Sequence, residues 1–256
     1  MRNEQCIAIY KYRSLTGQYG RESVERAIIN NELYWQSPLQ FNDPFDCLPK
    51  LYFGDNEDQR KAFYTRASKK VSEGQTRASR RRHRRNMIKM PASLMEENLK
   101  EAWQRWLRNS AVACFSEVSD HPLMWGHYAD SHGGVCLAFQ EVCKDETEWF
   151  AFPVFYQSAR PRVNLTEMGD PNIMMEALFL KSDHWSYELE QRMFAWDVAP
   201  GYKTFPASSL KGVILGARIK SDDEEFIRNL ILKRPELDLF RAEMDADEFK
   251  INITPI

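Results

Sequence analysis

Hydrophobic residues in the C-terminal part of the chain occur in short runs separated by turn residues. Such runs, rich in β-branched and aromatic side chains, are typical of β-strands. The sequence predicts strands over residues 111–117, 134–139, 149–156, 188–196, 212–216 and 249–253. Two more strands are predicted nearer the N-terminus, over residues 6–15 and in the stretch from Leu33 that ends at Pro38.

Residues 55–109 show a different pattern, with many charged residues and few strand formers. Leu99, Trp103, Trp106 and Leu107 recur at three- and four-residue spacing, which is typical of the buried face of a helix. We therefore expect a helical insertion between two strand-rich parts of the chain.

Several positions predict the start of a helix. Asp170 followed by Pro171 combines an N-cap residue with a proline suited to the first helical turn. Ser93 and Ser221 each precede a glutamate by three residues, which is the spacing of a capping box. The segment after Ser221 also carries an apolar stripe at Phe226, Ile227, Leu230 and Ile231.

The predicted strands outnumber the predicted helices, and some connections between them are too short for a crossover helix. This combination favours an α+β fold with a mixed, largely antiparallel sheet. No internal repeat or low-complexity linker divides the chain. We expect a single α+β domain over residues 1–256, with the helical, arginine-rich insertion at 55–109 within it.

Composition narrows the class of protein. The 256 residues are 43% hydrophobic and 12% aromatic, which is enough for a core without disulfides. The formal net charge of −2 argues against attraction of the whole surface to nucleic acid or to an anionic membrane. Five scattered cysteines without CxxC spacing indicate reduced thiols, and no apolar run is long enough for a signal peptide or a membrane span. These features predict a soluble, cytoplasmic protein.

The first candidate for chemistry is the stretch WSYELEQRMFAW, residues 185–196. Alternate side chains of a strand share a face, so Glu188, Glu190 and Arg192 would form one row. Such a row is commonly an exposed set of ion pairs that contributes little to stability. The functional interpretation is a carboxylate that faces a sugar or another developing positive charge.

A second candidate is the stretch 114–134, which contains three of the five histidines. Trp125, His127 and Tyr128 offer ring faces and polar groups for the wall of a ligand pocket. The same residues can instead form a short helix that packs on the core. His127 and His132 are five residues apart, which matches no common ligand spacing. A metal-dependent nuclease is therefore the weakest alternative, and no metal is expected.

Two basic segments suit anions. In YKYR, residues 10–13, Lys11 and Arg13 share one side of a predicted strand, either as a solvated edge or as a phosphate contact. The run RASRRRHRRN, residues 77–86, is either a solvated helix face or a contact to nucleic acid or an acidic partner. The residues that would make this contact are Arg80, Arg81, Arg82, Arg84 and Arg85.

Taken together, the motifs resemble a known family. The bacterial domain of unknown function 2971 has the same order of segments as YKYR, LYWQSPLQFNDPFDC, CFSE, PLMWGHYADSHGGVCLAF, HWSYELEQR and GVILG in this chain. More distantly, the order of parts resembles the ADP-ribosyltransferase fold. That fold has a first strand with Arg or His, a middle strand with a Ser-containing motif or an aromatic residue, and a late strand with Glu, often as E-x-E.

The second resemblance implies an activity on NAD. Glu190 would stabilise an oxocarbenium-like ribose as nicotinamide leaves, and Glu188 would orient or deprotonate the acceptor. Arg13 would hold the diphosphate, and aromatic rings would stack on nicotinamide. The implied cofactor-binding residues are Arg13, Lys11, Tyr12, Ser116, Trp125, His127 and Tyr128.

The expected function is therefore that of an NAD-dependent enzyme, either a mono-ADP-ribosyltransferase or an NAD glycohydrolase. Toxins and phage-defence effectors are the classes of protein that this resemblance implies. The alternative is a non-catalytic protein of an uncharacterised bacterial family that binds a ligand through its aromatic and histidine-rich stretch. In that case the arginine run would contact nucleic acid or an acidic partner.

Overall fold

The chain divides into two compact units. The computed structural model describes residues 7–71, 76–141, 149–167 and 170–256. Unit 1 comprises Met1–Ser37, Ser110–Val154 and His184–Ile256. Unit 2 comprises Pro38–Asn109 and Phe155–Asp183.

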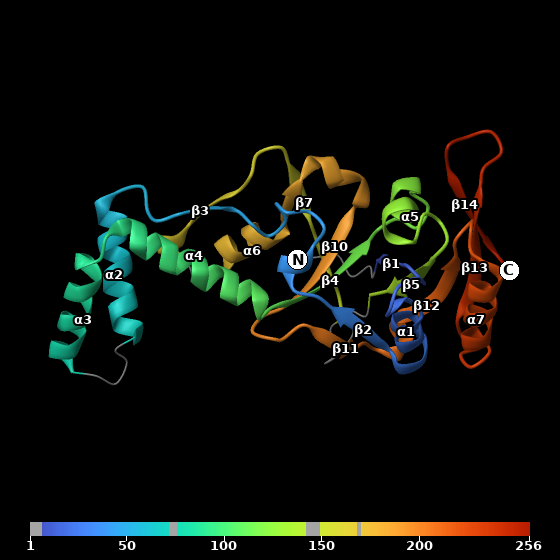
Figure 1. The fold of residues 1–256 in the computed structure, drawn as a ribbon, viewed down its shortest axis with the longest axis horizontal. Coiled ribbons are helices and arrows are strands. Elements are labelled where there is room, and N and C mark those ends of the chain that lie inside the picture. Colours follow the sequence, from blue (N-terminus) through green and yellow to red (C-terminus); the bar gives the residue numbers. More distant parts are fainter. Residues whose placement is uncertain (1–6, 72–75, 142–148, 168–169) are drawn as a thin grey trace. The chain divides into compact units, whose positions relative to one another are not determined.

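Unit 1 is built on an eight-stranded sheet with the order β14-β13-β12-β5-β1-β4-β10-β6 (Figure 1). Its strands are β1 (Ala8–Arg13), β4 (Ala111–Ser116), β5 (Val135–Gln140), β6 (Phe152–Pro153), β10 (Glu190–Ala195), β12 (Leu210–Leu215), β13 (Asp238–Met244) and β14 (Ile251–Pro255). Neighbouring strands run antiparallel, except that β12 and β13 are parallel. Helix α7 (Ser221–Ile231) connects this parallel pair, which needs a crossover. The prediction of a mixed, largely antiparallel sheet combined with helices is confirmed.

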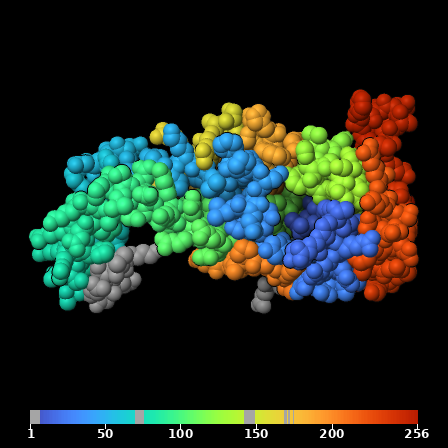
Figure 2. All heavy atoms as spheres, viewed as in Figure 1, coloured from blue at the N-terminus to red at the C-terminus, as the bar shows by residue number. Residues whose placement is uncertain are grey.

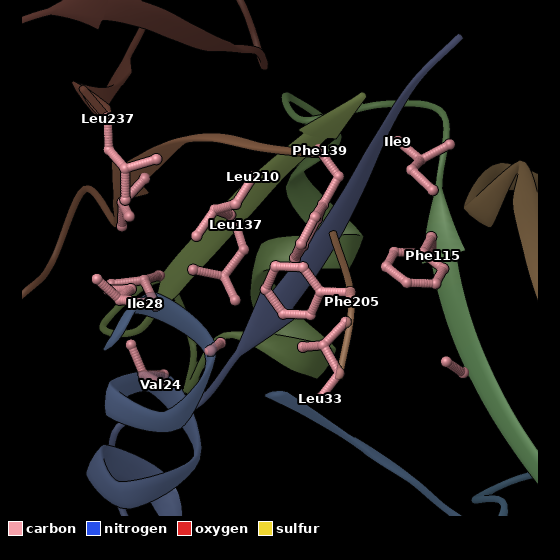
Figure 3. Close-up of a cluster of buried hydrophobic side chains, with 14 of the residues drawn as sticks. Ile9, Val24, Ile28, Leu33, Phe115, Leu137, Phe139, Phe205, Leu210 and Leu237 are labelled. Carbon is pink, nitrogen blue, oxygen red and sulfur yellow. The ribbon is translucent and has the colours of Figure 1, made fainter. Parts of the chain in front are cut away.

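One face of this sheet carries the larger hydrophobic cluster. Figure 3 shows Ile9 of β1 near Phe115 on one side of this cluster, and Val24 of α1 (Gly20–Glu25) with Ile28 of the helical turn η1 (Arg26–Asn30) on the other side. The side chains of Ile9, Val24 and Ile28 have no exposed surface. This burial explains why the segment with Val24 and Ile28 forms a helix against the sheet.

The opposite face of the sheet carries a second cluster. Tyr12 of β1 and Cys136 of β5 pack there against Met124 and Trp125 of helix α5 (Pro122–Tyr128). Alternate residues of a strand point to opposite faces, so neighbouring positions of β1 serve the two clusters. Helix α5 is therefore fixed on the face that Tyr12 occupies.

Several strand predictions need correction. The strand predicted to end at Pro38 is β2 (Glu32–Trp35), which pairs with β11 (Gly201–Thr204). The last predicted strand begins at Ile251, and Phe249 is fully exposed in the loop before it. Strands β11 and β13 were not predicted, because neither segment is a continuous apolar run.

Unit 2 contains the helices predicted for the insertion, α2 (Glu57–Val71), α3 (Arg77–Lys89) and α4 (Ala92–Arg108). Two small parallel sheets complete this unit with helix α6 and two short helical turns. Their bounds are β3 (Lys50–Tyr52) with β8 (Arg162–Asn164), β7 (Phe155–Gln157) with β9 (Leu180–Ser182), α6 (Pro171–Phe179), η2 (Pro38–Gln40) and η3 (Leu165–Glu167).

Unit 2 has a core of its own. Phe53, Tyr64, Met95 and Leu165 form its buried cluster. Trp103 and Leu107 of α4 are completely buried, which confirms the predicted apolar stripe of this helix.

The predicted helix starts are confirmed only in part. Asp170 caps α6, because its Oδ1 accepts a hydrogen bond from the backbone N–H of Asn172 at 2.9 Å. The capping boxes are wrong, because α4 begins at Ala92 and α7 begins at Ser221 itself, so that Ser93 and Ser221 lie inside their helices. The N-cap positions are Pro91 and Lys220, neither of which forms a side-chain cap.

Cys47, Cys114 and Cys136 are free thiols, and Cys6 and Cys143 lie outside the described residues. In the part of the chain that the structure describes, no helix combines the length and apolar character that crossing a membrane requires.

Candidate functional site

The three strands that carry the predicted site residues are neighbours in the sheet of unit 1. Strand β4 lies between β1 and β10. In register, Ser116 of β4 lies opposite Tyr10 of β1 on one side and opposite Glu190 of β10 on the other. Segments that are far apart along the chain therefore form one row, in which Tyr10, Ser116 and Glu190 share a face.

Strands β1 and β4 are paired at the Tyr10–Ser116 position. At the next residue of β1, a side chain connects the two strands, because Nζ of Lys11 donates a hydrogen bond to the carbonyl oxygen of Cys114 at 2.7 Å. The Lys11 amine also lies 5.0 Å from the centre of the Phe115 ring. Burial first and the charge of Arg13 second lower the pKa of Lys11 to about 7, although Cys114 and Glu190 act in the opposite direction.

Ser116 is 1% exposed, and its hydroxyl forms hydrogen bonds with the backbone of two nearby segments. The hydroxyl donates to the carbonyl oxygen of Glu188 at 2.6 Å and accepts from the N–H of Val118 at 3.1 Å. The predicted middle-strand serine therefore positions the backbone at Glu188 in this structure.

Glu188 does not lie in the strand row predicted from the sequence. It ends a helical turn, η4 (Asp183–Glu188), and Leu189 has a positive φ of 41°, so that β10 begins only at Glu190. The positive φ at Leu189 means that Glu188 and Glu190 do not belong to one continuous strand, so their side chains do not share a face as the sequence predicts. Glu188 is 3% exposed, and its Oε1 accepts a hydrogen bond from the Tyr128 hydroxyl at 2.5 Å.

Glu190 and Arg192 share a face, as the sequence predicts, but they are buried and not an exposed pair. Nε of Arg192 lies 2.7 Å from Oε1 of Glu190, and Nη2 lies 3.0 Å from Oε2. The exposed fractions are 4% for Glu190 and 0% for Arg192. This two-pronged contact balances the charge of the carboxylate inside the protein. The thiol of Cys114 lies nearby, and burial first and the Glu190 charge second raise its pKa.

The basic residues of β1 alternate with its tyrosines. Tyr10 and Tyr12 belong to the α5 side of the sheet, so alternation directs Lys11 and Arg13 to the other side. Nε of Arg13 has no hydrogen-bond partner among the described residues. Burial lowers the pKa of Arg13, and Tyr202 and Cys114 act against this shift. Tyr10, and not Arg13, therefore shares the row with Ser116 and Glu190.

Two of the rings predicted to stack on a ligand are buried in the core. Trp125 has no exposed surface, and its Nε1 donates to the Ser119 carbonyl at 2.8 Å. Tyr12 is 7% exposed, donates to the Val118 carbonyl at 2.9 Å and packs edge-on against Trp125 at 5.2 Å. Burial raises the pKa of Tyr12. Both rings hold α5 and the loop before it on the sheet, and neither presents an open face.

A cluster of rings surrounds the Glu188 turn. His121 stacks on Tyr187, with ring centres 5.3 Å apart and an angle of 23° between the planes. His127 lies 6.3 Å from Tyr128 and 6.4 Å from Tyr187, and Trp185 lies 6.2 Å from Tyr187. We call these five residues the ring cluster.

The ring cluster combines exposure with polar groups. His127 is exposed, the other four side chains are half-buried, and Nδ1 of His121 has no hydrogen-bond partner among the described residues. Flat rings of this kind suit an aromatic ligand.

Sequence reasoning included His127 and Tyr128 but did not place His121, Trp185 and Tyr187 in the site. The aromatic residues on either side of Glu188 were the available signal. The two histidines considered for a metal site differ in their surroundings, since His132 lies in a turn with a φ of 73°. Burial first and the charge of Arg218 second lower the pKa of His132. Among the described residues, no group of three or more His, Cys, Asp or Glu side chains is arranged to hold a metal ion.

Residues 124–193 match the profile of a family described as Protein of unknown function (DUF2971). The matched stretch runs from α5 to β10 and includes Tyr128, Tyr187, Glu188, Glu190 and Arg192. It supports the family resemblance that the motifs indicate. No curated protein and no solved structure matches the chain.

Proposed function

We propose that this protein cleaves NAD between nicotinamide and ribose and transfers ADP-ribose to an acceptor or to water. The observation that carries the proposal is the pair of buried carboxylates, Glu188 and Glu190, at the start of a strand beside the serine-bearing strand. We base the proposal on this arrangement together with the distant resemblance of the sequence to the ADP-ribosyltransferase fold.

The chemistry needs a negative charge close to the ribose. The bond between the ribose carbon and the nicotinamide nitrogen breaks, and its electron pair neutralises the pyridinium, so no general acid is required. The ribose develops oxocarbenium character, which a nearby carboxylate stabilises. The acceptor or a water molecule then forms the new bond to that carbon and loses a proton.

The two carboxylates differ in their surroundings, and this difference assigns their roles. Glu188 contacts the ring cluster through Tyr128, so it is our candidate for the acid that faces the ribose and the incoming acceptor. The charge of Glu190 is balanced by Arg192 at 2.7 Å, so we assign Glu190 to positioning the strand start. In this proposal the half-buried rings Tyr128 and Tyr187 stack on nicotinamide.

The role of Arg13 as a diphosphate contact becomes less direct. Arg13 lies on the opposite face of the sheet from the row of Tyr10, Ser116 and Glu190. It would therefore contact only a part of NAD that extends beyond this row. Consumption of NAD or modification of an essential acceptor suits a toxin or phage-defence effector, as the resemblance implies.

The test is an incubation of the purified protein with NAD labelled in the adenosine part, alone and with cell extract. We expect release of nicotinamide, with the label in free ADP-ribose or on an acceptor. Glu188→Gln keeps the shape of the side chain, and we expect it to lower kcat by about 100-fold or more while KM changes little, because it removes a charge needed in the transition state.

Glu243→Gln, an exposed position on β13, is the matched control and should leave the rate unchanged. Absence of both nicotinamide release and labelled acceptor, together with no NAD binding by calorimetry, would sink the proposal. Binding without cleavage, unchanged in Glu188→Gln, would favour the non-catalytic alternative.

A further inference from the structure

Helix α3 of unit 2 concentrates positive charge. Its 13 residues include six arginines and one lysine, and no aspartate or glutamate. None of its residues is buried. The exposed cations are Arg77, Arg81, Arg82, Arg84, Arg85 and Lys89. The helix forms part of the surface visible in Figure 2 and lies beside α2 in Figure 1.

The packing of α3 against the core of unit 2 determines which side of the helix is exposed. Met87 is half-buried and packs on the cluster of Phe53, Tyr64, Met95 and Leu165. At roughly 3.6 residues per turn, the exposed cations fall within about half of the helix circumference, which extends from Arg84, a neighbour of Met87, to Arg82 on the opposite side. We call this side the basic face.

Neighbouring acids do not neutralise the basic face. In the part of the chain that the structure describes, no ion pair joins a cation of α3 to an acid. Glu57 at the start of α2 pairs with Lys61 of the same helix at 2.9 Å, and Glu96 of α4 pairs with Lys100. The positive charge of the basic face is therefore available to a partner.

The two units carry opposite net charges. Unit 2 has 19 Lys and Arg against 13 Asp and Glu, a net charge of +6. Unit 1 has 16 against 24, a net charge of −8, and together they give the −2 of the whole chain. The charge of the basic face therefore belongs to a unit that is itself positive.

We infer that the basic face of α3 binds the phosphate backbone of duplex nucleic acid without reading the base sequence. A helix of 13 residues is about 20 Å long, at about 1.5 Å per residue. One strand of a duplex carries a phosphate about every 3.4 Å along the axis, so about six phosphates per strand lie within this length, and the six exposed cations set an upper limit of six contacts. Arginine suits this role, because its planar fork matches phosphate oxygens.

The composition of α3 favours a duplex over other anionic partners. It has no Phe, Tyr or Trp, and its one imidazole, that of His83, is half-buried, so it offers no large open ring for stacking on the bases of a single strand. Helices that lie on membranes insert a continuous apolar face, whereas Met87 of α3 packs against the core of unit 2 and Ile88 is a single exposed apolar side chain among the cations. The binding energy would therefore come from charge, and it would fall steeply with salt.

The test measures binding of the full chain to a fluorescent DNA duplex of about 20 base pairs, between about 50 and 200 mM salt. Six contacts predict a slope of about −5 for log K against log salt, at about −0.9 per phosphate. The variant with Arg81→Gln, Arg82→Gln, Arg84→Gln and Arg85→Gln retains helix-forming residues, and its slope should fall to about −2, with a loss of affinity of about 10-fold or more.

The matched control removes the same charge from exposed positions of unit 1, through Lys211→Gln, Arg218→Gln, Lys220→Gln and Lys233→Gln. It should bind as the unaltered chain does, and a duplex of unrelated sequence should bind equally. The inference fails if the unaltered chain does not bind at low salt, if both variants lose affinity equally, or if the α3 variant retains it. It also fails if anionic vesicles bind more tightly than the duplex. Circular dichroism of the α3 variant confirms that the helix is retained.

Discussion

The Glu190–Arg192 pair shows how much the surroundings of a residue change its energetics. A pair of this kind on a surface contributes little, because water screens it. At 4% and 0% exposure, each charge depends on the other to offset its lost hydration. The same two residues therefore have a structural role that their spacing along a strand does not reveal.

Removing one partner of this pair should be more costly than removing both. We expect Arg192→Met to lower the free energy of unfolding by about 3–5 kcal/mol, because it removes the guanidinium that contacts both carboxylate oxygens of the buried Glu190. The double variant with Glu190→Leu should recover much of this loss. Urea unfolding followed by circular dichroism measures both, and equal losses in the single and double variants would contradict the explanation.

Lys11 gives stability a dependence on pH. Its pKa is about 7 in the folded protein, against an ordinary value of 10.5 in the unfolded chain. Above pH 7 the folded state loses this proton while the unfolded state keeps it, so the contribution of Lys11 to the free energy of unfolding increases with pH. The slope is at most about 1.4 kcal/mol per pH unit.

Lys11→Met should remove this dependence. The free energy of unfolding of the unaltered protein, minus that of the variant, should increase between about pH 7 and pH 8.5. The thiols of Cys114 and Cys136, whose pKa values are raised in the fold, are present in both proteins, so their effect on the pH dependence largely cancels in this difference. A difference that stays constant from pH 7 to 8.5 would show that Lys11 titrates normally.

At the scale of elements, the turn between α5 and β5 has a tightly constrained backbone. Asp130, Ser131 and His132 have consecutive positive φ values of 52°, 52° and 73°. Gly134 lies two residues after His132, and a Cβ added there would lie 2.2 Å from the carbonyl oxygen of Arg13. The close approach of β1 to this turn therefore requires glycine at 134.

Gly134→Ala tests this constraint. We expect it to lower the free energy of unfolding by about 1–3 kcal/mol, since the added methyl group forces backbone atoms apart. Gly126→Ala, inside α5, is the matched control, because an added Cβ there meets no atom within 4 Å. That variant should be unchanged or more stable by about 0.5–1 kcal/mol, since alanine favours helices. Similar melting temperatures for the two variants would argue against the contact.

The elements also show where sequence patterns succeed and fail. The stripe through Trp103 and Leu107 predicts α4 correctly, because a helix that buries one face needs apolar residues at that spacing. The capping boxes fail because the same spacing occurs one residue inside a helix, as at Ser93. The strand predicted from residue 188 begins only at Glu190, because Leu189 has a positive φ. The order of apolar and polar residues does not indicate this change in the backbone.

At the scale of the whole molecule, averaged quantities hide the distribution of charge. The net charge of −2 argues against whole-surface attraction to nucleic acid, yet it is the sum of a positive unit and a negative unit. Each unit also has its own buried cluster, with Ile9 and Phe139 in unit 1 and Phe53 and Leu165 in unit 2. Local surfaces, and not the total, therefore decide what each unit attracts.

Local regularities were enough to predict the strands around Tyr10, Ser116 and Glu190, the helices of residues 55–109 and the arginine-rich run, because each depends on neighbours within a few residues. The order of the sheet, the burial of Glu190 with Arg192, and the meeting of Tyr128 with Glu188 depend on contacts between distant segments. Those contacts form only when the chain has folded, since pairing and burial involve partners that a linear pattern does not specify.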